Sequence, residues 1–140
     1  MEFAEDVKTL RRGPKIEIPA LIGAVIDLGL CLDLTTSAGV QHVRSAHHQL
    51  VQIANKAGYE LPKNSPDLLR RNLDCAVITL LHDIREEADD APIDTVRGIF
   101  LEGAPIYEGS GFFEKTHIQI CVCNPECIKG VFRVPKHQMA

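Results

Sequence analysis

The sequence lacks an excess of positive charge and a long hydrophobic run, and each absence argues against a class of function. Fifteen Lys and Arg residues are outnumbered by nineteen Asp and Glu residues, which gives a formal net charge of −4. A chain of this balance has no electrostatic reason to bind a polyanion, so nucleic acid is not expected as a partner. The longest apolar stretch begins at Ile18 and is interrupted by Asp27. It is well short of the roughly twenty apolar residues that span a bilayer, so no membrane span is expected.

An export signal is also lacking. The N-terminal segment MEFAEDVKTLRRG is charged and amphipathic, without the apolar core and small-residue cleavage site of a signal peptide. We therefore expect a cytoplasmic protein. The five cysteines are an odd number in such a chain, which favours reduced thiols over a disulfide framework.

Three segments carry apolar residues at helical spacing. They predict helices over residues 3–10, 36–58 and 73–85, the second with Thr36 or Ser37 as N-cap and Gly58 as its stop. Ser65 and Pro66 predict a further short helix over 67–71. The apolar stripe expected to face the core from the second helix comprises Val40, Val43, Leu50, Ile53 and Ala57.

The remaining segments have the pattern of strands. The nearly continuous apolar run 20–35 predicts a strand buried on both faces in the middle of a sheet. Short β-like segments punctuated by glycine and proline follow at 95–100, 105–107, 116–122 and 128–134. With 140 residues and no internal repeat, the chain has the length of one domain, residues 1–140. The order of elements predicts an α+β fold, with helices packed to one side of a largely antiparallel sheet.

One candidate metal site comprises His117, Cys121, Cys123 and Cys127, a set of nitrogen and sulfur ligands of the kind that zinc prefers. Its spacing argues against zinc. On an extended strand the six steps from His117 to Cys123 cover about 20 Å, at roughly 3.3 Å per residue, so the two cannot hold one ion. We expect no metal, and assign the cysteines to packing or to surface thiols. His42, His47 and His48 do not share a helix face and are expected on a solvated surface.

Glu114 is the residue best placed to carry chemistry. It lies where a glycine-rich segment meets the predicted strand, flanked by Phe112 and Phe113, so its carboxylate can be held at the mouth of a cleft. The glycines before it match no phosphate-binding pattern and favour a surface loop. The alternative is a solvated Glu114 paired with Lys115 or Arg97.

Several motifs together resemble a known family. They are IGAVIDLGLCLDL from Ile22, LDCAVI from Leu73 and DTVRGIFLEGAPIYEGSGFFEKTHIQICVCNPECIKGVF from Asp94. Together they are similar to the C-terminal two-thirds of small microbial proteins of the ADP-ribosyltransferase fold, the fold of poly(ADP-ribose) polymerases and related toxins. The resemblance runs from about Glu2 to Pro135.

The resemblance implies a split sheet that holds NAD in a cleft, with NAD as substrate. It implies that Glu114, in FFEKTHIQI, corresponds to the glutamate that contacts the nicotinamide ribose and stabilises the oxocarbenium-like transition state. A fixed carboxylate is the right electrostatic partner for the positive charge that develops there. The glycine-rich loop before Glu114 would then present the acceptor substrate.

The sequence also departs from the family pattern. Family members carry an upstream strand with a histidine or arginine and a second strand with a tyrosine or serine, which together bind NAD. Neither is found, because residues 1–10 resemble the helix that follows those strands. Cys123 stands where relatives would carry a basic residue.

Two hypotheses follow from these departures. The first is an ADP-ribosyltransferase-like protein that handles NAD, either as an active ADP-ribosyltransferase or NAD glycohydrolase with Glu114 as its catalytic residue, or in a catalytically incomplete form. The second is a non-enzymatic module that pairs an exposed sheet edge with a protein partner or with a second copy of the chain.

Overall fold

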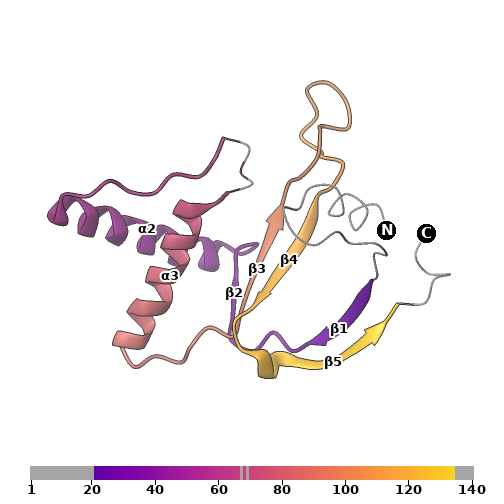
Figure 1. Ribbon diagram of the computed structural model, residues 1–140, viewed down its shortest axis with the longest axis horizontal. Coiled ribbons are helices and arrows are strands. Elements are labelled where there is room, and N and C mark those ends of the chain that lie inside the picture. Colours follow the sequence, from indigo (N-terminus) through magenta and orange to yellow (C-terminus); the bar gives the residue numbers. More distant parts are fainter. Residues whose placement is uncertain (1–20, 67, 69, 135–140) are drawn as a thin grey trace, which may run out of the picture. The chain divides into compact units, whose positions relative to one another are not determined.

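The computed structural model describes residues 21–66, 68 and 70–134. They form two compact units, which are described separately below; the expectation of a single domain over 1–140 stays a prediction. In chain order the elements are β1 (Ile22–Ile26), β2 (Cys31–Asp33), α2 (Ser37–Ala57), α3 (Asn72–Glu87), β3 (Thr95–Phe100), β4 (His117–Val122), the short 3-10 helix η1 (Pro125–Cys127) and β5 (Ile128–Arg133) (Figure 1).

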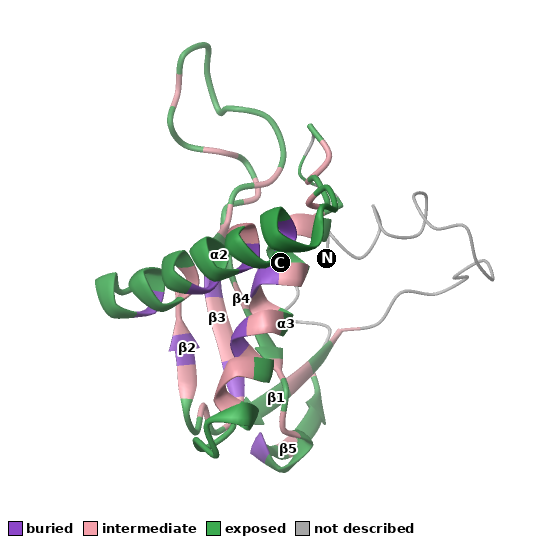
Figure 2. Cartoon of the chain, turned by 90° about the vertical axis from the view of Figure 1, so that its left-hand side faces the viewer, coloured by how far each residue is buried: buried purple, intermediate pink, exposed green. Residues whose placement is uncertain are grey.

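The unit formed by residues 28–124 holds a three-stranded sheet in the order β2-β3-β4. β3 and β4 are antiparallel, with Thr95 opposite Val122 and Phe100 opposite His117, whereas β2 runs parallel to β3. Both helices lie on the same side of this sheet, where most of the buried residues gather (Figure 2). The predicted α+β class and the packing of helices to one side are therefore confirmed.

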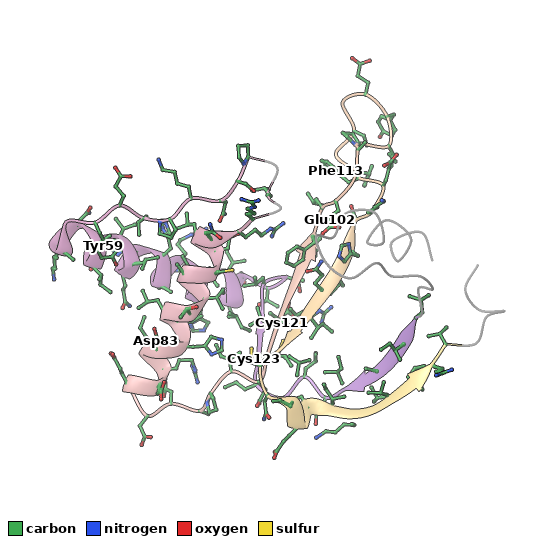
Figure 3. All side chains as sticks on the ribbon, viewed as in Figure 1. Tyr59, Asp83, Glu102, Phe113, Cys121 and Cys123 are labelled. Carbon is green, nitrogen blue, oxygen red and sulfur yellow. The ribbon has the colours of Figure 1, made fainter. Side chains whose placement is uncertain are left out.

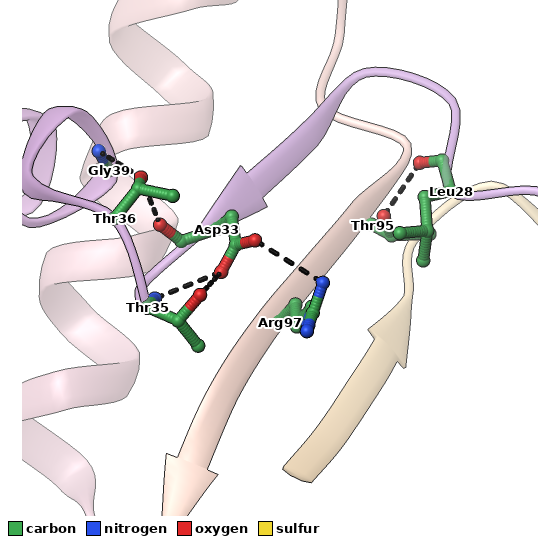
Figure 4. Close-up of polar contacts among 7 residues, drawn as sticks. All are labelled: Leu28, Asp33, Thr35, Thr36, Gly39, Thr95 and Arg97. Atoms are coloured by element: carbon green, nitrogen blue, oxygen red, sulfur yellow. Dashed lines mark hydrogen bonds and ion pairs between the residues drawn. The ribbon is translucent and has the colours of Figure 1, made fainter.

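Helix α2 begins and ends where the sequence predicts. The Thr36 hydroxyl accepts a hydrogen bond from the Gly39 N–H at 3.1 Å (Figure 4). Gly58 ends the helix in the left-handed conformation. The predicted core stripe was partly wrong, because Val40, Ile53 and Ala57 are exposed. The buried stripe is shifted and consists mainly of small residues, which let the helix approach its neighbours: Gly39, Ala46, Leu50 and Ala54.

Helix α3 presents the apolar face that its sequence predicts. Val77 and Leu81 are buried, and Leu73, Ala76 and Leu80 pack half-buried beside them. The cluster joins both helices to β2 and to the segment before β3; its buried members are Leu32, Ala46, Leu50, Val77, Leu81 and Ile93.

The apolar run 20–35 does not form one central strand, and this prediction was wrong. It is divided into β1 and β2, which belong to different sheets, and each is an outer strand among the described residues. The division falls at Gly29, whose φ of +54° favours glycine. Asp94 fixes the turn by accepting a hydrogen bond from the Leu30 N–H at 2.8 Å. The hydroxyl of the fully buried Thr95 donates to the Leu28 carbonyl at 2.6 Å (Figure 4). Polar contacts with residues distant in the sequence therefore override the apolar continuity that suggested a single strand.

The second unit contributes β1 and β5, which pair in antiparallel register. Gly23 lies opposite Phe132, whose ring covers the glycine so closely that a Cβ would overlap it. Ile22 is 70% exposed and Val25 57%, so this ribbon does not have the two buried faces that the apolar run suggested.

Three smaller predictions have mixed outcomes. Residues 105–107 form no strand, because Pro105 makes only an isolated bridge to Phe113. The predicted helix 67–71 is also wrong where the chain is described: Asn64 and Arg71 close a loop by a bridge, and the Ser65 hydroxyl accepts the Arg70 N–H at 2.9 Å. The predicted helix 3–10 lies outside the described residues.

None of the described helices has the length and apolar character needed to cross a membrane.

Candidate functional site

Glu114 lies at the neck of the loop that joins β3 to β4. Its N–H donates to the Ala104 carbonyl at 3.0 Å, and its carboxylate accepts the Ala104 N–H at 3.3 Å. The Lys115 N–H donates to the Glu102 carbonyl at 3.0 Å, so the two arms of the loop are held together at its base (Figure 3). The structure therefore places the predicted acid on a braced backbone just before β4.

The loop geometry depends on a glycine beside this carboxylate. Gly103 has a φ of +80°, and a Cβ there would lie 3.2 Å from Glu114 Cβ and Oε2. Any other residue would be strained at this backbone conformation and would crowd the carboxylate.

The Glu114 carboxylate is exposed and, among the described residues, makes no ion pair. The predicted pairing with Arg97 was wrong, because the Arg97 guanidinium lies 3.5 Å from the Asp33 carboxylate instead (Figure 4). Glu114 therefore keeps an uncompensated negative charge at the loop neck.

Three planar side chains pack together where β3 ends and β4 begins. Phe100, at the end of β3, stacks on His117, at the start of β4, with ring centroids 6.2 Å apart. The Arg71 guanidinium lies over Phe100 at 4.3 Å from the ring centroid. His117 Nδ1 lies 2.7 Å from the Lys115 carbonyl and Nε2 lies 2.7 Å from Gln119 Nε2, which fixes the imidazole.

Asp33 and its hydrogen-bond partners form a polar cluster that is not among the site residues predicted from the sequence. Asp33 Oδ1 accepts hydrogen bonds from the Thr35 hydroxyl at 2.6 Å and from the Thr35 N–H at 2.9 Å. These hydrogen bonds, and then the charge of Arg97, hold the pKa of Asp33 below its ordinary value. Aspartate two residues before threonine at a helix start is a local signal that would have identified this contact.

The cysteines of the candidate zinc site are divided between different surroundings. Cys121 and Cys123 are exposed on the helix-facing side of the sheet (Figure 3), while Cys127 is buried in η1. Although Cys123 is exposed, partial desolvation of its thiol by surrounding atoms, and then the neighbouring Cys121 thiol, raise the pKa of Cys123, so its neutral form is favoured. Within the described part of the chain, no group of three or more His, Cys, Asp or Glu side chains is arranged to hold a metal ion.

A cavity of about 740 Å³ opens between the two helices and the sheet of the 28–124 unit. Phe100 and Arg71 belong to its lining, and so does the exposed His47 of α2. His42 faces a separate, smaller hollow beside Leu30 and Ile93. The remaining members of the cavity lining are Leu34, Val43, Arg44, Leu73, Asp74, Cys75, Val77, Ile78, Thr79, Val96, Cys121 and Cys123.

Comparisons of the chain with protein-family models, with curated proteins and with solved structures gave no match.

Proposed function

We propose that this chain is an ADP-ribosyltransferase-like protein that handles NAD, with Glu114 as the residue that stabilises positive charge on the nicotinamide ribose. The observation that carries the proposal is the exposed Glu114 carboxylate, which makes no ion pair with any residue that the structure describes and is held by the Ala104 N–H where the loop meets β4. A carboxylate already neutralised by a cation would have little charge left for a developing carbocation.

The chemistry requires one negative charge in a fixed position. The bond between nicotinamide and ribose C1 breaks, and nicotinamide leaves with the bonding electron pair. The ribose then carries an oxocarbenium-like charge, which Glu114 would stabilise. Water or an acceptor hydroxyl attacks C1 and loses its proton, giving free or transferred ADP-ribose. Removal of one preorganised electrostatic contact typically costs about 10²–10³ in rate.

A purely structural role for Glu114 must be separated from this one, because its carboxylate also braces the loop. Glu114→Gln keeps an oxygen that can accept the Ala104 N–H and removes the charge. Glu108→Gln is the matched control, since Glu108 is an exposed acid in the same loop. The test is release of nicotinamide from NAD by the purified wild-type chain and both variants, with thermal unfolding as a check on folding.

We expect release to fall by roughly 100-fold or more in Glu114→Gln and to be unchanged in Glu108→Gln. Nicotinamide release by the wild-type chain at a measurable rate that Glu114→Gln leaves unchanged would refute the role of Glu114. A wild-type chain that binds NAD without releasing nicotinamide would support the catalytically incomplete form of the proposal. A chain that neither binds nor cleaves NAD would refute the proposal altogether.

A second candidate function is protein interaction through the three-stranded sheet. β4 is an outer strand of this sheet, and the sheet face opposite the cavity exposes Ile99 (57%), Ile118 (52%) and Ile120 (40%). An exposed apolar strand at a sheet edge is a template for pairing with another chain, including a second copy. Analytical ultracentrifugation of the wild-type chain and of Ile118→Lys tests self-association. A dimeric wild-type chain and a monomeric variant would support this function. Monomers in both samples would show that a second copy of the chain is not the partner.

A further inference from the structure

The cavity between the helices and the sheet of the 28–124 unit has a lining that suits a ligand other than NAD. We propose that it binds a small molecule with an apolar body and one carboxylate, the class to which medium-chain fatty acids belong. The inference concerns the 28–124 unit and does not depend on the role of Glu114.

The size and walls of the cavity indicate the apolar body. Its volume of about 740 Å³ falls within the range of roughly 300–1,000 Å³ typical of small-molecule sites. The apolar wall residues come from both helices and from two strands or their ends: Leu34, Val43, Leu73, Val77, Ile78, Val96 and Phe100.

The charged lining residues indicate the carboxylate. Arg44 and Arg71 contribute two permanent positive charges against the single carboxylate of Asp74. Asp74 already accepts a hydrogen bond from the Asn64 amide at 2.9 Å. Arg71 is preorganised, since its Nε donates to the Leu68 carbonyl at 3.1 Å and its guanidinium lies over Phe100. A guanidinium held in this way suits a planar carboxylate, which it can bind through two parallel hydrogen bonds.

The same lining disfavours a dinucleotide. NAD carries a pyrophosphate and several ribose hydroxyls, and each of these groups that meets the apolar wall residues without a polar partner is costly to desolvate. A molecule with a single anionic end avoids this cost, because only its carboxylate needs polar partners.

Three thiols of the lining provide a direct readout in the unmodified protein. Cys75, Cys121 and Cys123 line the cavity and are exposed, whereas Cys31 lies outside it and is half-buried. A ligand inside the cavity should shield the first three from a thiol reagent and leave Cys31 unaffected. Alkylation of each cysteine by iodoacetamide can be followed by mass spectrometry of the digested chain.

The experiment compares decanoate, decyltrimethylammonium and NAD as protecting agents on the wild-type chain. We expect decanoate to slow alkylation of Cys75, Cys121 and Cys123 in a saturable manner, with no change at Cys31, and the cationic analogue and NAD to give no protection. Equal protection by the cationic analogue would overturn the carboxylate assignment. Protection by NAD in place of decanoate would overturn the ligand class, and no protection by decanoate would overturn the proposal.

Two arginine variants sharpen the test. Arg71→Gln should weaken decanoate binding roughly tenfold through loss of the charge-assisted hydrogen bonds. Arg70→Gln should bind as wild type does, because Arg70 is the adjacent arginine and does not line the cavity. Equal affinity in both variants would overturn the role of Arg71. If Arg71→Gln fails to fold, the protection pattern of the wild-type chain still decides the proposal.

Discussion

Replacement of Gly39 by alanine should destabilise the chain, although alanine is the better helix former. Gly39 lies in the first turn of α2, buried against the end of β2. A Cβ at this position would overlap the Asp33 carbonyl oxygen and lie 2.7 Å from its carbon. That carbonyl cannot easily move, since it also accepts the Thr36 hydroxyl at 2.8 Å.

The magnitude follows from two opposing terms. Alanine gains about 1 kcal/mol over glycine in a helix interior, and less near the helix start. Overpacking against a fixed backbone costs about 1–3 kcal/mol, and the overlap at Gly39 places this substitution at the upper end of that range. Gly39→Ala should therefore lower the free energy of unfolding by about 2 kcal/mol.

Urea unfolding followed by far-ultraviolet circular dichroism measures this change. Ser45→Ala is the control, because Ser45 is exposed in the middle of the same helix and should change stability by less than about 0.5 kcal/mol. A Gly39→Ala chain as stable as wild type would refute the close approach of α2 to β2.

Three further predictions concern buried and titrating groups. Thr95→Val removes the donor to the Leu28 carbonyl and should cost about 1–3 kcal/mol in urea unfolding. Because hydrogen bonds from Thr35 and the charge of Arg97 lower the pKa of Asp33 from 3.8, its carboxylate stabilises the fold above about pH 4 and loses this effect as the pH falls through the folded-state pKa. Asp33→Asn should therefore lose less stability than wild type on acidification. Because partial desolvation raises the pKa of Cys123, its alkylation should reach half-maximal rate at a higher pH in the folded chain than in urea.

Each of these predictions has a contrary result. Thr116→Val removes a similar hydroxyl-to-carbonyl hydrogen bond at an exposed position, so a cost equal to that of Thr95→Val would show that burial of Thr95 is unimportant. Parallel acid unfolding curves for wild type and Asp33→Asn would contradict the lowered pKa of Asp33. Equal alkylation midpoints in folded and unfolded chains would contradict the raised pKa of Cys123.

The helices and most strands could be predicted because their signals are local. Thr36 and Gly58 mark the ends of α2 through hydrogen bonding and backbone conformation that need no distant partner. Alternation of side chains along β4 likewise gives its two faces from the sequence alone.

The apolar run 20–35 could not be resolved in this way. A strand buried in a sheet and two outer strands joined by a turn can have the same apolar composition, and only the distant Asp94 and Thr95 distinguish them. The predicted ion pair of Arg97 with Glu114 was wrong for the same reason. The partner of Arg97 is Asp33, which the parallel pairing of β2 with β3 places opposite it. The position of Glu114 just before β4 could be predicted from the sequence, whereas its contact with Ala104 depends on closure of the loop.

The most direct test of the central claim separates NAD binding from bond cleavage. Titration calorimetry gives the Kd of NAD for wild type and Glu114→Gln, and a single-turnover assay gives the rate of nicotinamide release from bound NAD. Charge stabilisation in the transition state predicts similar Kd values and a release rate roughly 100-fold lower in Glu114→Gln. A variant that binds NAD much more weakly but releases nicotinamide from the bound state at the wild-type rate would contradict the account.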